Sequence, residues 1–171
     1  MTDFEGLIRR LNEADVHFVL VGGFAATVLG SARVTVDLDV VYARTPENLS
    51  RLAAALAPVS PYLRGAPLGL PFRLDVQTLT RGLNFTLTTA MGDLDLLGEV
   101  AGGGTYEQLL PHTRRIRVCG VEIDVVTLPQ LIRLKRAAGR PRDLAALAEL
   151  EALLEEIQRG RGEAPAADGD A

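Results

Sequence analysis

The chain has 171 residues, a formal net charge of −4 at pH 7 and an ordinary share of hydrophobic residues, 47%. This length fits one domain with a substantial core and leaves little room for a second full domain. The composition excludes a disordered chain, and the negative charge gives no general basic surface, so any nucleic-acid site must be local.

Cysteine, histidine and membrane signals exclude further classes. A single cysteine, Cys119, rules out an internal disulfide framework, and the two histidines, His17 and His112, lack the spacing of a zinc site. No segment reaches about 18 consecutive apolar residues, and residues 1–15 are charged and amphipathic. We therefore expect no membrane span, no signal peptide and a cytoplasmic location.

The first third of the chain predicts alternating helices and strands. Apolar residues recur at helical spacing over residues 3–14, which predicts an amphipathic helix. Residues 17–23 predict a buried strand that ends at paired glycines, and a short helix then stops at Gly30. A second strand is expected over residues 35–43. A threonine and an early proline predict a capped helix over residues 45–57.

The middle of the chain mixes loops and strands. Residues 58–71 are rich in proline and glycine and predict a loop or an irregular crossover. Strands are expected over residues 72–79, 83–89 and 92–100. A flexible turn and a short helix should follow over residues 101–110.

The last part of the chain predicts one hairpin and two helices. Residues 115–128 favour a hairpin that turns near Cys119. Residues 129–139 predict a helix that ends at glycine, and a proline begins the next helix, over residues 141–160.

Together these elements predict α+β architecture, a mixed β-sheet with flanking helices mainly on one side. The expected organisation is an α+β core over residues 1–128, a C-terminal helical segment packed on it over residues 129–160, and a disordered tail over residues 161–171.

Two carboxylates, Asp37 and Asp39, flank one leucine inside an apolar strand. Side chains two apart on a strand point to the same face, and two like charges roughly 6 Å apart repel by about 3 kcal/mol at an effective dielectric near 20. A divalent cation would resolve this conflict, because Mg²⁺ prefers hard oxygen ligands. The pair therefore predicts a metal site.

Such a site needs a third carboxylate from a neighbouring strand. A second D-x-D, Asp93 and Asp95, offers one, and we favour Asp95 because it lies deeper in the apolar run. Asp93, Asp75 and Asp124 remain alternatives.

Two further features suit an anionic ligand. Gly22 and Gly23 follow a strand and open a helix, which brings backbone N–H groups to a helix N-terminus where a phosphate can bind. Residues 133–142 concentrate cationic side chains near a helix end and the turn after it. Tight-turn geometry alone also explains the glycines.

The strand, Gly22-Gly23, the short helix, and then Arg33, Thr35 and the Asp37-Leu-Asp39 triplet resemble the nucleotidyltransferase signature of the DNA polymerase β superfamily. The pattern is most similar to the minimal bacterial branch with AbiEii-type and MenT-type toxins. Gly23 precedes Asp37 by fourteen positions, which fits that signature, although many members carry serine at position 23.

The resemblance implies that Asp37, Asp39 and Asp95 bind Mg²⁺, or Mn²⁺, and act in catalysis. It also implies that Gly22 and Gly23 contact the nucleotide phosphates and that Lys135 reaches the triphosphate. As further nucleotide-binding candidates we name Arg33, Thr35 and Arg142.

The expected function is Mg²⁺-dependent transfer of a nucleoside monophosphate from an NTP to an acceptor hydroxyl. The toxin-like resemblance implies an RNA acceptor such as the 3′ end of a tRNA, and an antitoxin partner; a protein or a small molecule stays open as the acceptor. The alternative is a catalytically silent nucleotide-binding or partner-binding module with the same fold.

Overall fold

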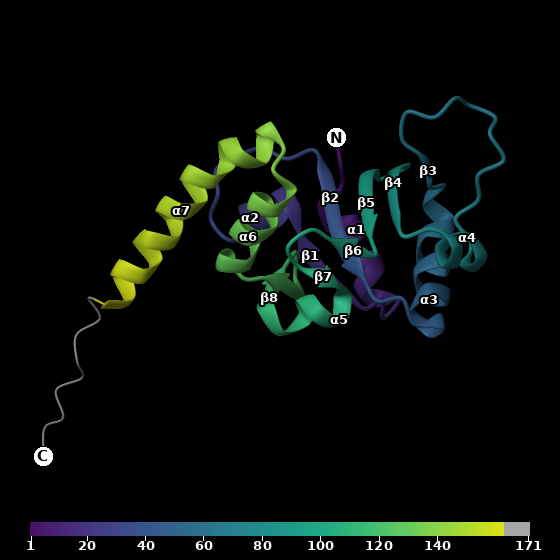
Figure 1. Ribbon diagram of the computed structural model, residues 1–171. Coiled ribbons are helices and arrows are strands. Elements are labelled where there is room, and N and C mark those ends of the chain that lie inside the picture. The colour runs from purple at the N-terminus through teal and green to yellow at the C-terminus, as the bar shows by residue number, and fades with distance from the viewer. Residues whose placement is uncertain (163–171) are drawn as a thin grey trace, which may run out of the picture.

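A computed structural model describes residues 1–162, so the expected tail over residues 161–171 lies almost wholly outside the described residues. Seven strands form one sheet in the order β3-β4-β5-β2-β1-β9-β8 (Figure 1). The strands are β1 (Phe18–Val21), β2 (Asp37–Tyr42), β3 (Tyr62–Leu63), β4 (Asn84–Thr89), β5 (Gly92–Leu97), β8 (Thr113–Val118) and β9 (Val121–Val126). The pairs β1–β9 and β2–β5 are parallel and the others antiparallel, which confirms a mixed sheet.

Helices and a small second sheet complete the described chain. The helices are α1 (Phe4–Glu13), α2 (Gly22–Val28), α3 (Pro46–Leu56), α4 (Val76–Arg81), α5 (Tyr106–Leu109), α6 (Leu128–Ala138) and α7 (Pro141–Gly162), with 3-10 turns η1 (Ala57–Val59) and η2 (Leu110–His112). The two-stranded sheet pairs β6 (Glu99–Val100) with β7 (Gly104–Thr105). No helix within residues 1–162 combines the length and the apolar character that crossing a bilayer requires.

Local chemistry explains most of the element boundaries. The Thr45 side chain accepts a hydrogen bond from the Asn48 N–H and so caps α3, whose first residue is proline. The β8–β9 hairpin turns through Cys119 and Gly120, which have φ angles of 51° and 79°, as a two-residue type I′ turn requires. Gly139 ends α6 in the left-handed conformation.

The strand predicted over residues 72–79 is wrong. The Asp75 side chain accepts a hydrogen bond from the Thr78 N–H and so begins α4, of which only Leu79 is buried. The alternating apolar residues at the start of this segment lie in irregular chain. The predicted loop over residues 58–71 does contain irregular chain, but it also supplies the edge strand β3.

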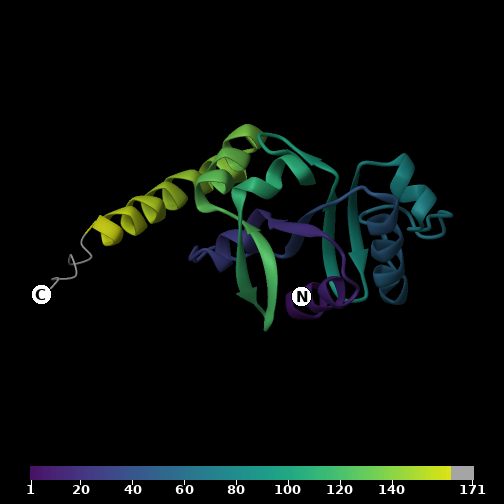
Figure 2. The ribbon, with the colours of Figure 1, turned by 90° about the horizontal axis from the view of Figure 1, so that it is seen from below.

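The sheet is covered on both sides. All four residues of β1 are buried, so apolar groups pack against both of its faces. Figure 2 shows α1 and α6 on opposite sides of the sheet, which corrects the expectation of helices mainly on one side. On β2 and β5 one face is apolar and fully buried; it carries Leu38, Val40, Leu94 and Leu96. The other face of these two strands carries the aspartates.

Candidate functional site

Parallel pairing of β2 with β5 brings the two D-x-D sequences together. Asp37 lies opposite Asp93 and Asp39 opposite Asp95, so all four side chains share one face of the sheet. One carboxylate oxygen from each of Asp37, Asp39 and Asp95 lies within 4.8 Å of the others. The favoured third carboxylate therefore joins the predicted pair.

The alternative third carboxylates lie differently. Asp75 caps α4 and Asp124, on β9, forms an ion pair with Arg115 at 3.4 Å, so neither belongs to this cluster. Asp93 lies two residues before Asp95 on β5. The group of three close carboxylates within residues 1–162 nevertheless includes Asp95 and not Asp93.

Gly22 and Gly23 shape the floor of the site. Gly22 has a φ of 70°, and a Cβ atom there would lie 2.2 Å from Oδ2 of Asp39. A Cβ atom on Gly23 would lie 2.5 Å from Oγ1 of Thr35. The turn from β1 into α2 thus packs directly against Asp39 and Thr35, and a side chain at either glycine would displace them.

Asp39 has no ion pair within 4.0 Å among residues 1–162, and its hydrogen-bonding neighbour is the Asp95 side chain. Burial, followed by repulsion from Asp37 and Asp95, raises the pKa of Asp39 to about 7. Burial also raises the pKa of Asp95, against the opposing charge of Arg64. The cluster therefore carries negative charge that the protein leaves partly uncompensated.

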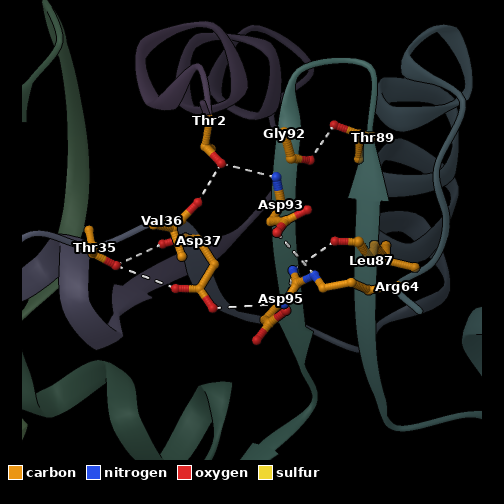
Figure 3. A network of polar contacts seen from close by, with 10 residues as sticks. All are labelled: Thr2, Thr35, Val36, Asp37, Arg64, Leu87, Thr89, Gly92, Asp93 and Asp95. Atoms are coloured by element: carbon orange, nitrogen blue, oxygen red, sulfur yellow. Dashed lines mark hydrogen bonds and ion pairs between the residues drawn. The ribbon is translucent and has the colours of Figure 1, made fainter. Parts of the chain in front are cut away.

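Arg64 reaches into the cluster from the loop after β3 (Figure 3). Its Nη2 lies 2.8 Å from Oδ1 of Asp95, its Nε 3.4 Å from Oδ2 of Asp93, and its Nη1 3.8 Å from Oδ2 of Asp37. One guanidinium thus faces three carboxylates from two strands.

Two threonines fix the entrance of β2. The Thr2 hydroxyl donates to the Val36 carbonyl and accepts from the Asp93 N–H, which ties the starts of β2 and β5 together (Figure 3). The Thr35 hydroxyl lies 3.3 Å from the Asp37 carbonyl oxygen and 3.4 Å from Oδ1 of the same residue. These contacts hold Asp37 at the edge of the cluster.

A cavity of about 430 Å³ opens beside the aspartates. Eight of the nine candidate site residues named from the sequence line it: Gly22, Gly23, Arg33, Thr35, Asp37, Asp39, Lys135 and Arg142. The ninth, Asp95, joins through the carboxylate cluster. Apolar walls come from β1, α6 and α7, among them Val21, Leu131, Leu134 and Leu150.

The cationic wall of the cavity is built around a buried acid. Asp143 is 4% exposed; Nε of Arg140 lies 2.6 Å and Nζ of Lys135 lies 3.7 Å from its carboxylate oxygens. Burial acts to raise the pKa of Asp143, but the hydrogen bond and charge of Arg140, with the charge of Lys135, hold it below the usual value. The charges of Arg142 and Arg140 both act on Asp39.

Arg33 lines the cavity but is already engaged by α7. Its Nε lies 2.9 Å from Oε2 of Glu149, and its Nη2 donates to the Ala145 carbonyl at 2.7 Å. Glu149 also accepts hydrogen bonds from the Ser31 hydroxyl and the Ala32 N–H. The observed contacts of Arg33 therefore anchor the loop before β2 to the C-terminal helix.

The donor set of the cluster fits a divalent cation. Carboxylate oxygens are the hard ligands that Mg²⁺ and Mn²⁺ prefer, and three of them lie close enough for one ion. Asp39, partly buried and without an ion pair in the described residues, is the side chain that most needs such a charge.

Sequence reasoning missed Arg64, Asp93 as a partner of Arg64, and Glu149. Four aspartates in two D-x-D pairs signal that a cation is needed, but nothing in the sequence singles out Arg64 from the other arginines. Glu149 lies on a predicted helix with several other acids and carries no distinguishing signal.

The comparisons with known proteins add a likeness of fold. No protein-family profile matches the chain, and no curated protein matches it. The chain is similar to a crystal structure of a candidate nucleotidyltransferase from Thermotoga maritima, at 15% identity and a TM-score of 0.49, over 93% of this chain and 96% of that one. At this identity and score the likeness carries no weight for the chemistry, which stands on the side chains described above.

Proposed function

We propose that the chain is a nucleotidyltransferase that moves a nucleoside monophosphate from an NTP to an acceptor hydroxyl with release of pyrophosphate. One observation carries the proposal: Asp37, Asp39 and Asp95 converge beside a cavity of about 430 Å³ that Lys135 and Arg142 also line. Acids and cations that line one cavity suit a metal-bound polyphosphate.

Asp37, Asp39 and Asp95 would hold Mg²⁺, with Mn²⁺ as the alternative ion. When bound, the ion neutralises charge that develops on the transferring phosphoryl group and its leaving oxygen. The resemblance to the DNA polymerase β superfamily, expected from the sequence, agrees with this donor set.

Five residues in the cavity would hold the nucleotide. The first N–H groups of α2, at Gly22 and Gly23, have no partner within their own helix and suit phosphate oxygens. Lys135 and Arg142 supply positive charge from α6 and α7. The Thr35 hydroxyl lies where a serine at position 23 would place its side chain, so we infer that it replaces that hydroxyl.

The transfer is an in-line displacement at the α-phosphorus. The acceptor oxygen forms a bond to the α-phosphorus while the bond from that phosphorus to the oxygen bridging the α- and β-phosphates breaks. Pyrophosphate leaves with the electron pair. The acceptor proton goes to the Asp95 carboxylate, and burial, which raises the pKa of Asp95, makes this carboxylate a better base.

As the acceptor we propose RNA, for example the 3′ end of a tRNA. The stretch over residues 133–142 lies beside the cavity, but Arg136 pairs with Glu151 and Arg140 with Asp143. Within residues 1–162, Arg133 and Arg142 have no carboxylate within 4.0 Å and would contact RNA phosphates. A protein or a small molecule is the alternative acceptor. An antitoxin would be a separate binding partner.

The test is pyrophosphate release with each of the four NTPs, Mg²⁺ and total cellular RNA. We expect release that Asp37→Asn and Asp39→Asn both abolish, while Asp124→Asn, which removes a strand carboxylate outside the cluster, keeps it. Full activity in both cluster variants would overturn the proposal. Replacing the RNA with protein or small-molecule fractions identifies the acceptor class.

The second candidate function is a silent nucleotide-binding or partner-binding module. Arg64 favours it, because an internal guanidinium already neutralises part of the acidic cluster. Calorimetry with each NTP, with and without Mg²⁺, separates the two: nucleotide binding without pyrophosphate release would support the module.

A further inference from the structure

Arg64 is an unusual neighbour for a metal site, because it reaches the carboxylates from the far edge of the sheet. It follows β3, and the sheet order places β4 and β5 between that edge and Asp37 on β2. Its backbone N–H donates to the Thr86 carbonyl and its Nη2 donates to the Leu87 carbonyl at 2.7 Å, both on β4. These contacts to β4 fix the guanidinium over the cluster.

The guanidinium pairs with three aspartates and not with Asp39. It contacts Asp95, Asp93 and Asp37 with three different nitrogens, the closest 2.8 Å from Oδ1 of Asp95 (Figure 3). The side chain is 27% exposed, so water screens these contacts only in part. Asp39 lies outside the reach of its hydrogen bonds and ion pairs.

Charge counting shows what the cluster can still accept. With Asp93 counted beside the cluster because it also pairs with Arg64, four ionised aspartates and one guanidinium leave three negative charges, and one divalent cation reduces this to one. A second divalent cation would make the cluster positive while lying against the guanidinium, a like charge. Arg64 already faces Oδ1 of Asp95 and Oδ2 of Asp37, so these two oxygens are less open to a second ion.

We propose that Arg64 takes the place of a second divalent cation, so that the cluster binds a single ion, through Asp39 and the oxygens of Asp37 and Asp95 that do not face Arg64. Arg64 acts as a positioning residue: it holds Asp93 and Asp95 in place while the ion occupies the Asp39 side. This inference rests on the proposed function only in requiring that the cluster binds a divalent cation.

The test is the number of Mn²⁺ ions bound per chain, measured by calorimetry and by electron paramagnetic resonance of the bound ion. We expect one ion in the wild type, two magnetically coupled ions in Arg64→Gln and in Arg64→Met, and one in Arg64→Lys, which restores the charge. Arg115→Gln removes a comparable ion pair outside the cluster and should keep one ion.

Each outcome decides a different point. Two ions in the wild type, or one ion in a folded Arg64→Gln or Arg64→Met variant, would overturn the role of Arg64 and leave the nucleotidyltransferase proposal standing. No ion in the wild type would overturn both. Melting curves followed by circular dichroism establish that each variant is folded. A wild-type count of two Mn²⁺ ions, or of none, overturns the role of Arg64 without any variant.

Discussion

Asp39→Asn should stabilise the metal-free protein at pH 8 and have little effect on stability near pH 4. Burial and the charges of Asp37 and Asp95 raise the pKa of Asp39 to about 7 from its ordinary value of 3.8. The folded state therefore binds more protons than the unfolded state between these values, so stability falls as pH rises through this window and the full cost is present above pH 7. Asparagine has nearly the same shape and stays neutral.

The size of the effect follows from the shift. Each pKa unit corresponds to about 1.4 kcal/mol, so a shift of roughly three units sets an upper limit of about 4 kcal/mol. Because the side chain is only partly buried and water screens part of the repulsion, we expect a gain of about 2 kcal/mol at pH 8.

Urea denaturation in EDTA at pH 4 and pH 8, followed by circular dichroism, measures this gain. Asp124→Asn is the matched control and should show no comparable gain at pH 8. Saturating Mg²⁺ should reverse the order, since the wild type is stabilised by ion binding and the variant is not. The reasoning is refuted if Asp39→Asn is less stable than the wild type at pH 8 without metal.

Three other substitutions test the surroundings of the site. Gly22→Ala should cost at least about 2 kcal/mol, because its Cβ would overlap Asp39 and its φ is 70°; an unchanged denaturation midpoint would contradict this. Asp143→Asn should lower the free energy of unfolding by about 3 kcal/mol, because it leaves Lys135 and Arg140 without their buried partner. The wild type should become less stable as pH falls below about 4, and the variant should lack this pH dependence. Equal stability of the two proteins in urea at pH 7 would argue against this role of Asp143. Glu149→Gln should release residues 31–33 from the C-terminal helix and speed their amide hydrogen exchange without changing Mn²⁺ affinity. Unchanged exchange would show that Glu149 does not hold these residues in place.

The fold could be predicted where local chemistry decides it. The cap at Thr45, the turn at Gly120 and the stop at Gly139 are encoded within a few residues, and each prediction is confirmed. The segment over residues 72–79 failed because its helix start depends on one hydrogen bond from the Thr78 N–H to Asp75, which the alternating apolar residues conceal. Coverage of both faces of β1 depends on tertiary packing.

The site could be predicted in part for the same reason. The spacing of Asp37 and Asp39 on a strand places both side chains on one face, so their proximity followed from the sequence. Asp95 lies beside them because two strands more than fifty residues apart pair in parallel, and local sequence patterns do not specify that pairing. Arg64 meets Asp95 across β4, and Glu149 meets Arg33 from the last helix, so both contacts arise only in the folded chain.

The most direct test of nucleotidyl transfer compares NTPs labelled at the α- or the γ-phosphate, incubated with the protein, Mg²⁺ and RNA. The account predicts α-label joined to the acceptor and γ-label released as pyrophosphate, with both products absent in Asp37→Asn and Asp39→Asn. γ-Label on the acceptor, or α-label transfer that persists at full rate in both variants, would contradict it.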